Sequence, residues 1–300
     1  MTTGYRGRFA PSPTGPLHFG SLIAAVGSYL EARTRDGAWL VRIEDLDAHR
    51  NVPGAADAIL KTIEAAGMDW DGAVVHQSSR RGAYDAAMHE LGRQGHVYGC
   101  VCSRREIADS ALEGSEGYVY PGTCRRGLAE GQRARAWRVR THGSRIAFND
   151  AVQGRIEQDI ERDIGDFVLL RADGLHAYQL AVVVDDAEQG ITHVVRGADL
   201  LDSTPRQIYL QQLLGLPAQQ YAHLPVAVNS HGQKLSKQTC APAIDISNIG
   251  RALWAALRFL GHPPSLELRN APVKEIWSWA LQHWQLERVP RARSVQSTYP

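Results

Sequence analysis

The feature that most constrains the fold of this chain is a proline-rich loop near its N-terminus, Pro11-Ser-Pro-Thr-Gly-Pro16. Its three prolines lack amide donors and its glycine favours a turn, so regular structure is excluded there. An extended stretch at residues 5–10 precedes the loop, and apolar residues at helical spacing follow it at 22–30, before a stop signal at Asp36-Gly37. Residues 38–43 are typical of a buried strand. Strand, loop, helix and strand in this order predict an α/β fold with a doubly wound parallel sheet, and the loop then lies at the strand ends, where such folds bind ligands.

Composition limits the class of protein. Hydrophobic residues make up 44% of the chain and charged residues 22%, which are ordinary globular values. No apolar run approaches the roughly 20 residues of a membrane span, and residues 1–8 lack a signal-peptide pattern, so we expect a cytoplasmic protein without membrane contact. A net charge of +1 provides no global field for nucleic acid, so an RNA partner would need local basic patches. The sequence does not determine the oligomeric state, and a monomer is the working expectation.

The rest of the chain divides into four predicted parts: residues 1–98, 99–175, 176–240 and 241–300. Helices are predicted at 53–66, closed by Gly67, and at 80–94. Residues 99–175 form an insertion that contains cysteines and an arginine-rich strand pair at 134–140 and 146–150. Strands return at 178–184 and 192–196. Ser203 then caps a helix that extends to residue 214, and the tryptophan-bearing tail forms a small helical subdomain.

Two segments carry residues suited to a nucleotide. In His18-Phe-Gly-Ser21, the loop delivers a histidine and a glycine to a helix N-terminus, whose free amides and partial positive charge suit phosphate groups. In Lys234-Leu-Ser-Lys237-Gln238, two of the chain's four lysines share one polar loop, where mobile ammonium groups can meet the charge of a departing pyrophosphate. Taken singly, the first segment is equally a tight turn with a surface histidine, and the second a solvated basic loop.

Together these segments resemble the HIGH and KMSKS motifs of class I aminoacyl-tRNA synthetases. Serine replaces the last histidine of the first motif, and the second ends in Gln238. The resemblance continues in Arg42-Ile-Glu44-Asp-Leu-Asp47 and in the segment from Val195 to Gln207, which are similar to the glutamyl branch of this class. The resemblance implies the class I catalytic fold and the formation of an acyl-adenylate from glutamate and ATP, with Mg²⁺ accompanying the ATP.

The resemblance and the charges of glutamate together assign residues to roles. Two carboxylates need arginines and the ammonium needs an acid. The glutamate-binding residues are then Arg8, Ala10, Ser12, Glu44, Tyr178 and Arg196. The ATP-binding residues are His18, Gly20, Ser21, Lys234, Ser236 and Lys237, of which His18 and Lys237 are the catalytic pair. For each residue alone, a structural ion pair or a turn hydrogen bond is the alternative.

Three cysteines in the insertion, Cys100, Cys102 and Cys124, indicate a structural zinc site, because three thiolates suit Zn²⁺ and no secretory context favours disulfides. The resemblance implies Tyr120 as the fourth ligand. Reduced cysteines without metal are the alternative, and Cys240 is interpreted as a structural thiol. Several arginines lie nearby, where they either contact RNA phosphates or form a charged solvent face. They are Arg125, Arg126, Arg133, Arg135, Arg138 and Arg140.

Only 62 residues follow Gln238, too few for a full anticodon-binding domain, so we expect none. This truncated pattern and the cysteine arrangement resemble one group of the glutamyl branch, the glutamyl-queuosine tRNA(Asp) synthetases. The resemblance implies activation of L-glutamate without tRNA and its transfer to queuosine in the anticodon loop of tRNA(Asp). The rival interpretations are a truncated synthetase that charges a tRNA 3′ end and a catalytically silent, zinc-containing RNA-binding protein.

Overall fold

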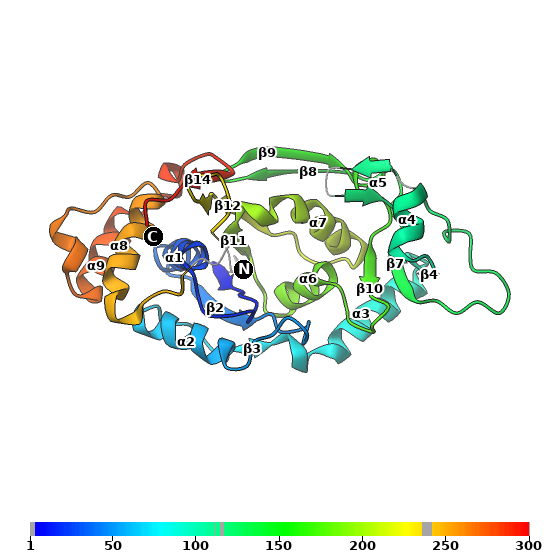
Figure 1. Cartoon of the computed structure of the whole chain (residues 1–300), viewed down its shortest axis with the longest axis horizontal. Helices are drawn as coiled ribbons and strands as arrows, with labels where there is room; N and C mark the ends of the chain where they lie inside the picture. The colour runs from blue at the N-terminus through cyan, green and yellow to red at the C-terminus, as the bar shows by residue number, and fades with distance from the viewer. Residues whose placement is uncertain (1–3, 111, 115–116, 236–241, 300) are drawn as a thin grey trace.

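The computed structural model describes residues 4–110, 112–114, 117–235 and 242–299. The molecule is elongated, with the parallel strands near its middle, the inserted segment at one end and the C-terminal helices at the other (Figure 1). The two ends of the molecule therefore lie on either side of the strands that hold the candidate site.

The N-terminal part is a parallel β–α–β arrangement. Strand β1 (Arg6–Phe9) pairs with β2 (Ala38–Ile43), which pairs with β3 (Val75–His76). Helix α1 (Phe19–Arg33) connects β1 to β2, and it is buried along most of its length because apolar residues occur on nearly all its sides. Gly27 allows this close packing, since a Cβ there would lie 2.5 Å from a methyl of Leu224. The predicted opening of the fold is confirmed.

The second half of the sheet continues from β1. The Thr192 amide donates to the Arg6 carbonyl at 3.0 Å, which sets β11 (His193–Gly197) beside β1, and β11 pairs in parallel with β12 (Gln220–Leu224). Helix α6 (Tyr178–Glu188) occupies residues for which the sequence predicted a strand, and that prediction is wrong. Its valines favour strands, but Leu180 to Val183 are all buried, so tertiary packing overrides propensity. The predicted helix α7 (Thr204–Leu213) is present, although the Ser203 hydroxyl does not cap it and instead accepts from Gln179.

The inserted segment contributes strands to two larger sheets, one of which is the sheet of β11 and β12. Strand β7 (Ala136–Val139) lies between β4 (Val97–Cys100) and β10 (Val168–Leu170). Strand β8 (Arg145–Asp150) instead pairs with β9 (Gly154–Asp159) and meets β12. The predicted arginine-rich strand pair is therefore wrong, because its two strands belong to different sheets. The partners of β7, and β12 as a partner of β8, lie far away in sequence, which a local pattern cannot indicate; β9, by contrast, follows β8 directly in a hairpin.

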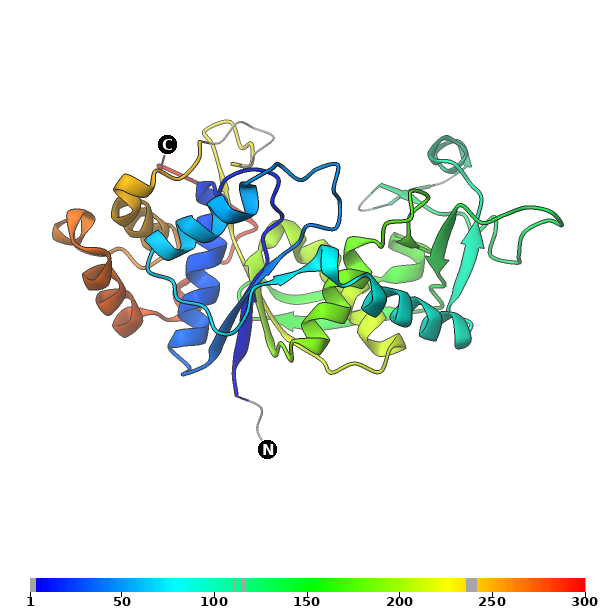
Figure 2. The same ribbon diagram turned by 90° about the horizontal axis from the view of Figure 1, so that it is seen from below.

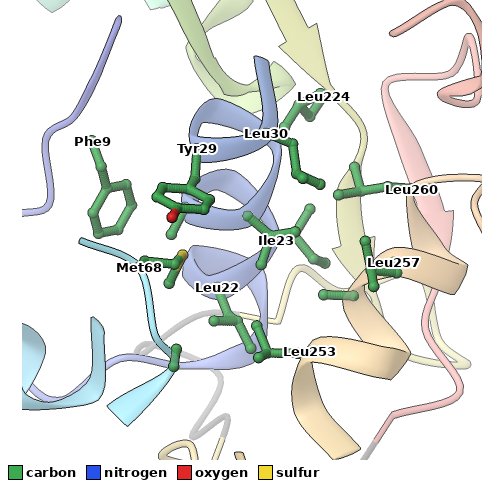
Figure 3. Close-up of a cluster of buried hydrophobic side chains, with 14 of the residues drawn as sticks. Phe9, Leu22, Ile23, Tyr29, Leu30, Met68, Leu224, Leu253, Leu257 and Leu260 are labelled. Atoms are coloured by element: carbon green, nitrogen blue, oxygen red, sulfur yellow. The ribbon is translucent and has the colours of Figure 1, made fainter. Parts of the chain in front are cut away.

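The C-terminal tail packs onto the first half of the sheet. Leu253 and Leu257 of α8 lie against Leu22 and Ile23 of α1 in one hydrophobic cluster (Figure 3). Strand β14 (Ser294–Gln296) returns to pair in parallel with β13 (Val226–Val228). The tail helices are α8 (Ile249–Phe259) and α9 (Val273–His283).

The remaining helices and strands connect or extend these parts. They are α2 (Ala55–Ala65), α3 (Arg81–Arg93), α4 (Arg104–Ser110), β5 (Leu112–Gly114), β6 (Gly117–Val119) and α5 (Ile160–Asp163). Predicted helices at 53–66 and 80–94 correspond to α2 and α3 and are confirmed. Among the described residues, no helix combines the length and apolar character that a bilayer crossing requires.

Candidate active site

A cavity of about 420 Å³ opens at the carboxyl ends of β1 and β11. It brings together the proline-rich loop, the start of α1, the end of β2 and the first residues of the lysine loop. Every predicted nucleotide-binding or glutamate-binding residue in the described part of the chain lines it. These are Arg8, Ala10, Ser12, His18, Gly20, Ser21, Glu44, Tyr178, Arg196 and Lys234.

The start of α1 forms one wall of the cavity. His18 is the N-cap residue, and its Nδ1 accepts a hydrogen bond from the Ser21 amide at 3.2 Å. This assigns the ring proton to Nε2, which lies 3.1 Å from the Ser21 hydroxyl and can donate to an anion. Gly20 lies against the lysine loop, because a Cβ at this position would come within 3.0 Å of the Leu235 carbonyl. Glycine therefore allows the two sequence-distant segments to meet.

The lysine loop reaches the same cavity. Lys234 lines it and forms an ion pair with Asp199 at 2.6 Å. Asp199, at the start of the turn after β11, is a cavity residue that the sequence interpretation did not single out. Ser236 and Lys237 lie outside the described residues, so their predicted roles stay predictions, as does the structural role of Cys240.

A buried charge network supports the other wall. Arg8 uses Nε and Nη2 on Asp186, leaving Nη1 without a hydrogen bond to the described residues. Arg42 is fully buried and contacts Asp186 at 2.7 Å and Glu44 at 3.2 Å. Burial raises the pKa of Asp186, but Arg8 and Arg42 outweigh this, and the net shift is downward. Arg8 is thus held in place by a fixed anion.

Glu44 and Tyr178 complete this wall. Burial raises the pKa of the Glu44 carboxyl, and the guanidinium groups of Arg42 and Arg8 oppose the rise. An arriving ammonium group would favour the ionised carboxylate further. Burial also raises the pKa of Tyr178, which keeps its phenol neutral and able to hydrogen-bond a ligand.

A second buried network orients Arg196. Its Nε donates to His223 Nε2 at 3.0 Å, and its Nη2 donates to Thr204 and Gln207, each at 2.8 Å. The carboxylate of Asp150 lies 2.6 Å from His223 Nδ1, which places the ring proton on that nitrogen and leaves Nε2 as the acceptor. Neutral His223 therefore accepts a hydrogen bond from Arg196 and orients it without adding a charge beside the guanidinium.

This network predicts an acid-sensitive fold. Burial, with Arg196, lowers the pKa of His223 from 6.5 to about 4, against the opposing effect of Asp150. Between these pH values the unfolded chain binds a proton that the folded chain does not, so stability falls as pH falls. The free energy of unfolding should drop by about 3 kcal/mol between pH 7 and pH 4 through this group. Urea unfolding across that range should show a shallower decline for His223→Gln, and equal declines would contradict the assignment.

Comparison with known proteins decides the family. Residues 5–258 match the family described as tRNA synthetases class I (E and Q), catalytic domain. A protein of Dechloromonas aromatica named glutamyl-Q tRNA(Asp) synthetase is 59% identical over 97% of both chains, and one of the same name from Chromobacterium violaceum is 58% identical over 95% of both. The chain belongs to the glutamyl-Q tRNA(Asp) synthetase family.

A solved structure supports the same fold. The glutamate tRNA ligase of Elizabethkingia meningosepticum, determined in complex with its amino acid, superposes with a TM-score of 0.79 and 26% identity. The superposition covers 99% of this chain and 67% of that one. The predicted class I synthetase fold is confirmed, and family membership makes this chain an ATP-dependent enzyme of the ligase type.

Three cysteines in the insertion lie close enough together to hold a metal ion. Cys102 Sγ lies 3.6 Å from Cys124 Sγ, and the Tyr120 hydroxyl lies 3.5 Å from the sulfurs of Cys100 and Cys102. Tetrahedral Zn²⁺, with Zn–S of about 2.3 Å and Zn–O of about 2.0 Å, requires separations of about 3.8 Å between sulfurs and about 3.5 Å between sulfur and oxygen. The four predicted donors fit such a site, in which the metal would be structural.

Arg138 supports this cluster from behind. Its Nε donates to Cys100 Sγ at 3.4 Å and its guanidinium lies 3.9 Å from the centre of the Tyr120 ring. Burial raises the pKa of Cys100, but the Tyr120 phenol and Arg138 lower it more. The thiolate form is therefore favoured at Cys100, whereas burial raises the pKa of Cys102.

Zinc analysis should return about one equivalent per chain for protein purified without added metal. Tyr120→Phe should weaken zinc retention against a chelator at least tenfold, since even residues behind the ligands affect affinity by roughly 10- to 100-fold. Tyr118→Phe is the matched control, because this neighbour is 60% exposed. Equal retention by the two variants would remove Tyr120 from the ligand set.

The arginines near the cysteines separate into two groups. Arg125, Arg138 and Arg140 bond within the insertion, as in the ion pair of Arg125 with Asp166 at 2.7 Å. Arg126, Arg133 and Arg135 are exposed. Only the exposed group is available to an RNA phosphate. The sequence offered no signal that separates the bonded arginines from the exposed ones, because the difference depends on which side of a strand or turn faces the interior.

Proposed function

We propose that this chain activates L-glutamate with ATP to glutamyl-adenylate and transfers the glutamate to the queuosine base in the anticodon loop of tRNA(Asp). The observation that carries the proposal is the charge pattern of the cavity. Arg8 and Arg196 provide two cationic groups for two carboxylates, and Glu44 provides one anion for an ammonium group. Few small molecules other than an acidic amino acid match that pattern.

The nucleotide half of the cavity supports adenylation. The His18 Nε2 proton, the backbone amides at the start of α1 and the Lys234 ammonium can all face phosphate oxygens. An oxygen of the glutamate α-carboxylate attacks the α-phosphorus of ATP, and the bond to pyrophosphate breaks. Positioning and charge stabilisation account for most catalysis of such a step. Mg²⁺ bound with ATP neutralises phosphate charge.

The second step is acyl transfer. A hydroxyl oxygen of the queuosine cyclopentenediol attacks the glutamyl carbonyl carbon, the bond from that carbon to the phosphate oxygen breaks, AMP leaves, and the hydroxyl proton passes to solvent. The name of the relatives, glutamyl-Q tRNA(Asp) synthetase, supports this acceptor. These relatives match the present chain over nearly their whole length. Because a tRNA substrate is made and used in the cytoplasm, we propose that compartment for the enzyme.

Two assays test the function. Glutamate-dependent exchange between ATP and pyrophosphate, measured without tRNA, should be present with active protein, and its absence would refute adenylation. Labelled glutamate should then appear on tRNA(Asp) that contains queuosine and not on tRNA(Asp) that lacks it. Label on both, or at a 3′ end, would indicate a synthetase that charges tRNA.

Lys237→Ala should reduce the exchange rate by about 10²-fold or more, the effect of losing one preorganised charge donor. Its neighbours Lys234 and Leu235 line the cavity, which supports a role there. Lys274→Ala is the matched control, because this exposed lysine lies on α9, outside the cavity lining. An exchange rate for Lys237→Ala like that of the control would refute the role of Lys237.

A further inference from the structure

A second cavity, of about 680 Å³, lies between α8 and the C-terminal segment. Three arginines line it: Arg251 and Arg258 from α8 and Arg269 from the turn that precedes α9. Aromatic rings form its floor, where Tyr299 stacks on Phe19 with ring centres 4.4 Å apart. The cavity thus combines cationic groups with ring faces.

The three arginines are exposed, and within the described part of the chain no carboxylate lies at ion-pair distance from any of them. Asp245, the one acidic residue among the described residues of the cavity lining, is engaged locally and accepts from the Ser247 amide and the Asn248 side chain. Many other exposed arginines have such partners, as in the pair of Arg293 with Asp202 at 2.9 Å. In a chain of net charge +1, this cluster is a local excess of positive charge.

Trp254 holds two of these guanidinium groups in place without neutralising them. Arg258 lies 4.7 Å and Arg269 5.6 Å from the centre of its ring. The indole is itself fixed, because its Nε1 donates to the Ser265 carbonyl at 2.9 Å. The arginines are therefore oriented but keep their hydrogen-bond donors for a ligand.

The cavity adjoins the candidate active site. His18 lines the catalytic cavity, and the next residue, Phe19, lines the arginine cavity. The chain leading to α8 runs along this wall, with the Ile244 amide donating to the Leu17 carbonyl at 2.9 Å. Figures 1 and 2 both place the C-terminal segment beside α8 and α1. A macromolecule that reaches into the catalytic cavity can therefore extend over the arginines.

We propose that Arg251, Arg258 and Arg269 bind phosphate groups of the RNA backbone while the acceptor base occupies the catalytic cavity. The identity of the RNA rests on the function proposed above. A guanidinium fork matches a phosphate in shape and charge, and repeated phosphates match three convergent forks better than a single small anion does.

The test is direct binding of tRNA(Asp) to the full chain, measured over a series of salt concentrations. Changing all three arginines to alanine should raise Kd by about tenfold or more at 0.1 M salt, and should make the slope of log K against log salt less negative by about 2. The loss should be equal for tRNA with and without queuosine, because the arginines contact the backbone. ATP–pyrophosphate exchange without tRNA should be unchanged, which also shows that the variant is folded.

A charge-matched control changes Arg81, Arg155 and Arg162 to alanine, since these exposed arginines lie outside the cavity lining. Equal losses in both triple variants would mean general electrostatic attraction and would overturn the proposal. Unchanged RNA binding by the Arg251, Arg258 and Arg269 variant would also overturn it and would point to a partner other than RNA. Because binding is measured directly, these outcomes are independent of whether glutamate is transferred.

Discussion

Replacing Arg196 with alanine should reduce kcat/KM for glutamate in ATP–pyrophosphate exchange by about 10²- to 10³-fold. The side chain is 5% exposed and is held by His223, Thr204 and Gln207, so it meets a carboxylate in fixed geometry. Losing one partner of a desolvated, hydrogen-bonded charge pair costs about 2–5 kcal/mol. Most of the loss should appear in KM if the contact is made equally in ground and transition states.

Arg293→Ala controls for the loss of one positive charge, because Arg293 is exposed and pairs with Asp202. It should retain exchange with unchanged glutamate KM. Arg196→Lys separates the effect of charge from the effect of geometry. Lysine keeps the positive charge but cannot reproduce the hydrogen bonds of the guanidinium to His223, Thr204 and Gln207. An Arg196→Ala enzyme with ordinary glutamate KM and kcat would refute the assignment.

Replacing Arg42 with methionine should lower the free energy of unfolding by about 3–5 kcal/mol, the cost of leaving buried carboxylates without their partner. Arg42 has no exposed surface and faces Glu44, Asp185 and Asp186, which are themselves buried. Methionine fills similar space, so the measured change reports the charge and not a cavity. Urea unfolding, followed by intrinsic tryptophan fluorescence, measures the difference.

Arg50→Met is the matched control, because Arg50 is 68% exposed and its pair with Asp47 lies at 3.4 Å. Its effect should stay within about 0.5 kcal/mol. A change below 1 kcal/mol for Arg42→Met would show that the network is not required for stability, contrary to the structure. A stable Arg42→Met protein that lost glutamate binding would separate the positioning of Glu44 from folding.

The predicted site residues came from motifs, and motifs list the residues that face the ligand. All ten described residues that were predicted to bind ATP or glutamate line one cavity, although their individual roles stay predictions. The residues behind them were missed. Asp186 holds Arg8, and His223 holds Arg196, yet neither belongs to one of the recognised motifs. The available signals were weak: two acids end the apolar run of α6, and one histidine interrupts the apolar strand β12.

Errors in secondary structure have a similar origin. The segment Tyr178–Glu188 contains three consecutive valines, whose stiff side chains favour strands in isolation. Packed as a helix, it places Asp185 and Asp186 where Arg42, Arg80 and Arg8 surround them. The gain from that burial and pairing depends on residues more than 100 positions away and is absent from any local window.

The sequence by itself determined the opening strand, loop and helix, the family and ten of the side chains that line the cavity. These properties depend on neighbouring residues, on backbone limits of proline and glycine, and on patterns shared by relatives. Only the tertiary structure decided which arginines are oriented by buried acids, which have no carboxylate partner among the described residues, and that the Tyr120 hydroxyl lies 3.5 Å from the sulfurs of Cys100 and Cys102. Such facts depend on where distant segments meet in space, because charge pairing and donor convergence act over a few ångströms and not along the chain.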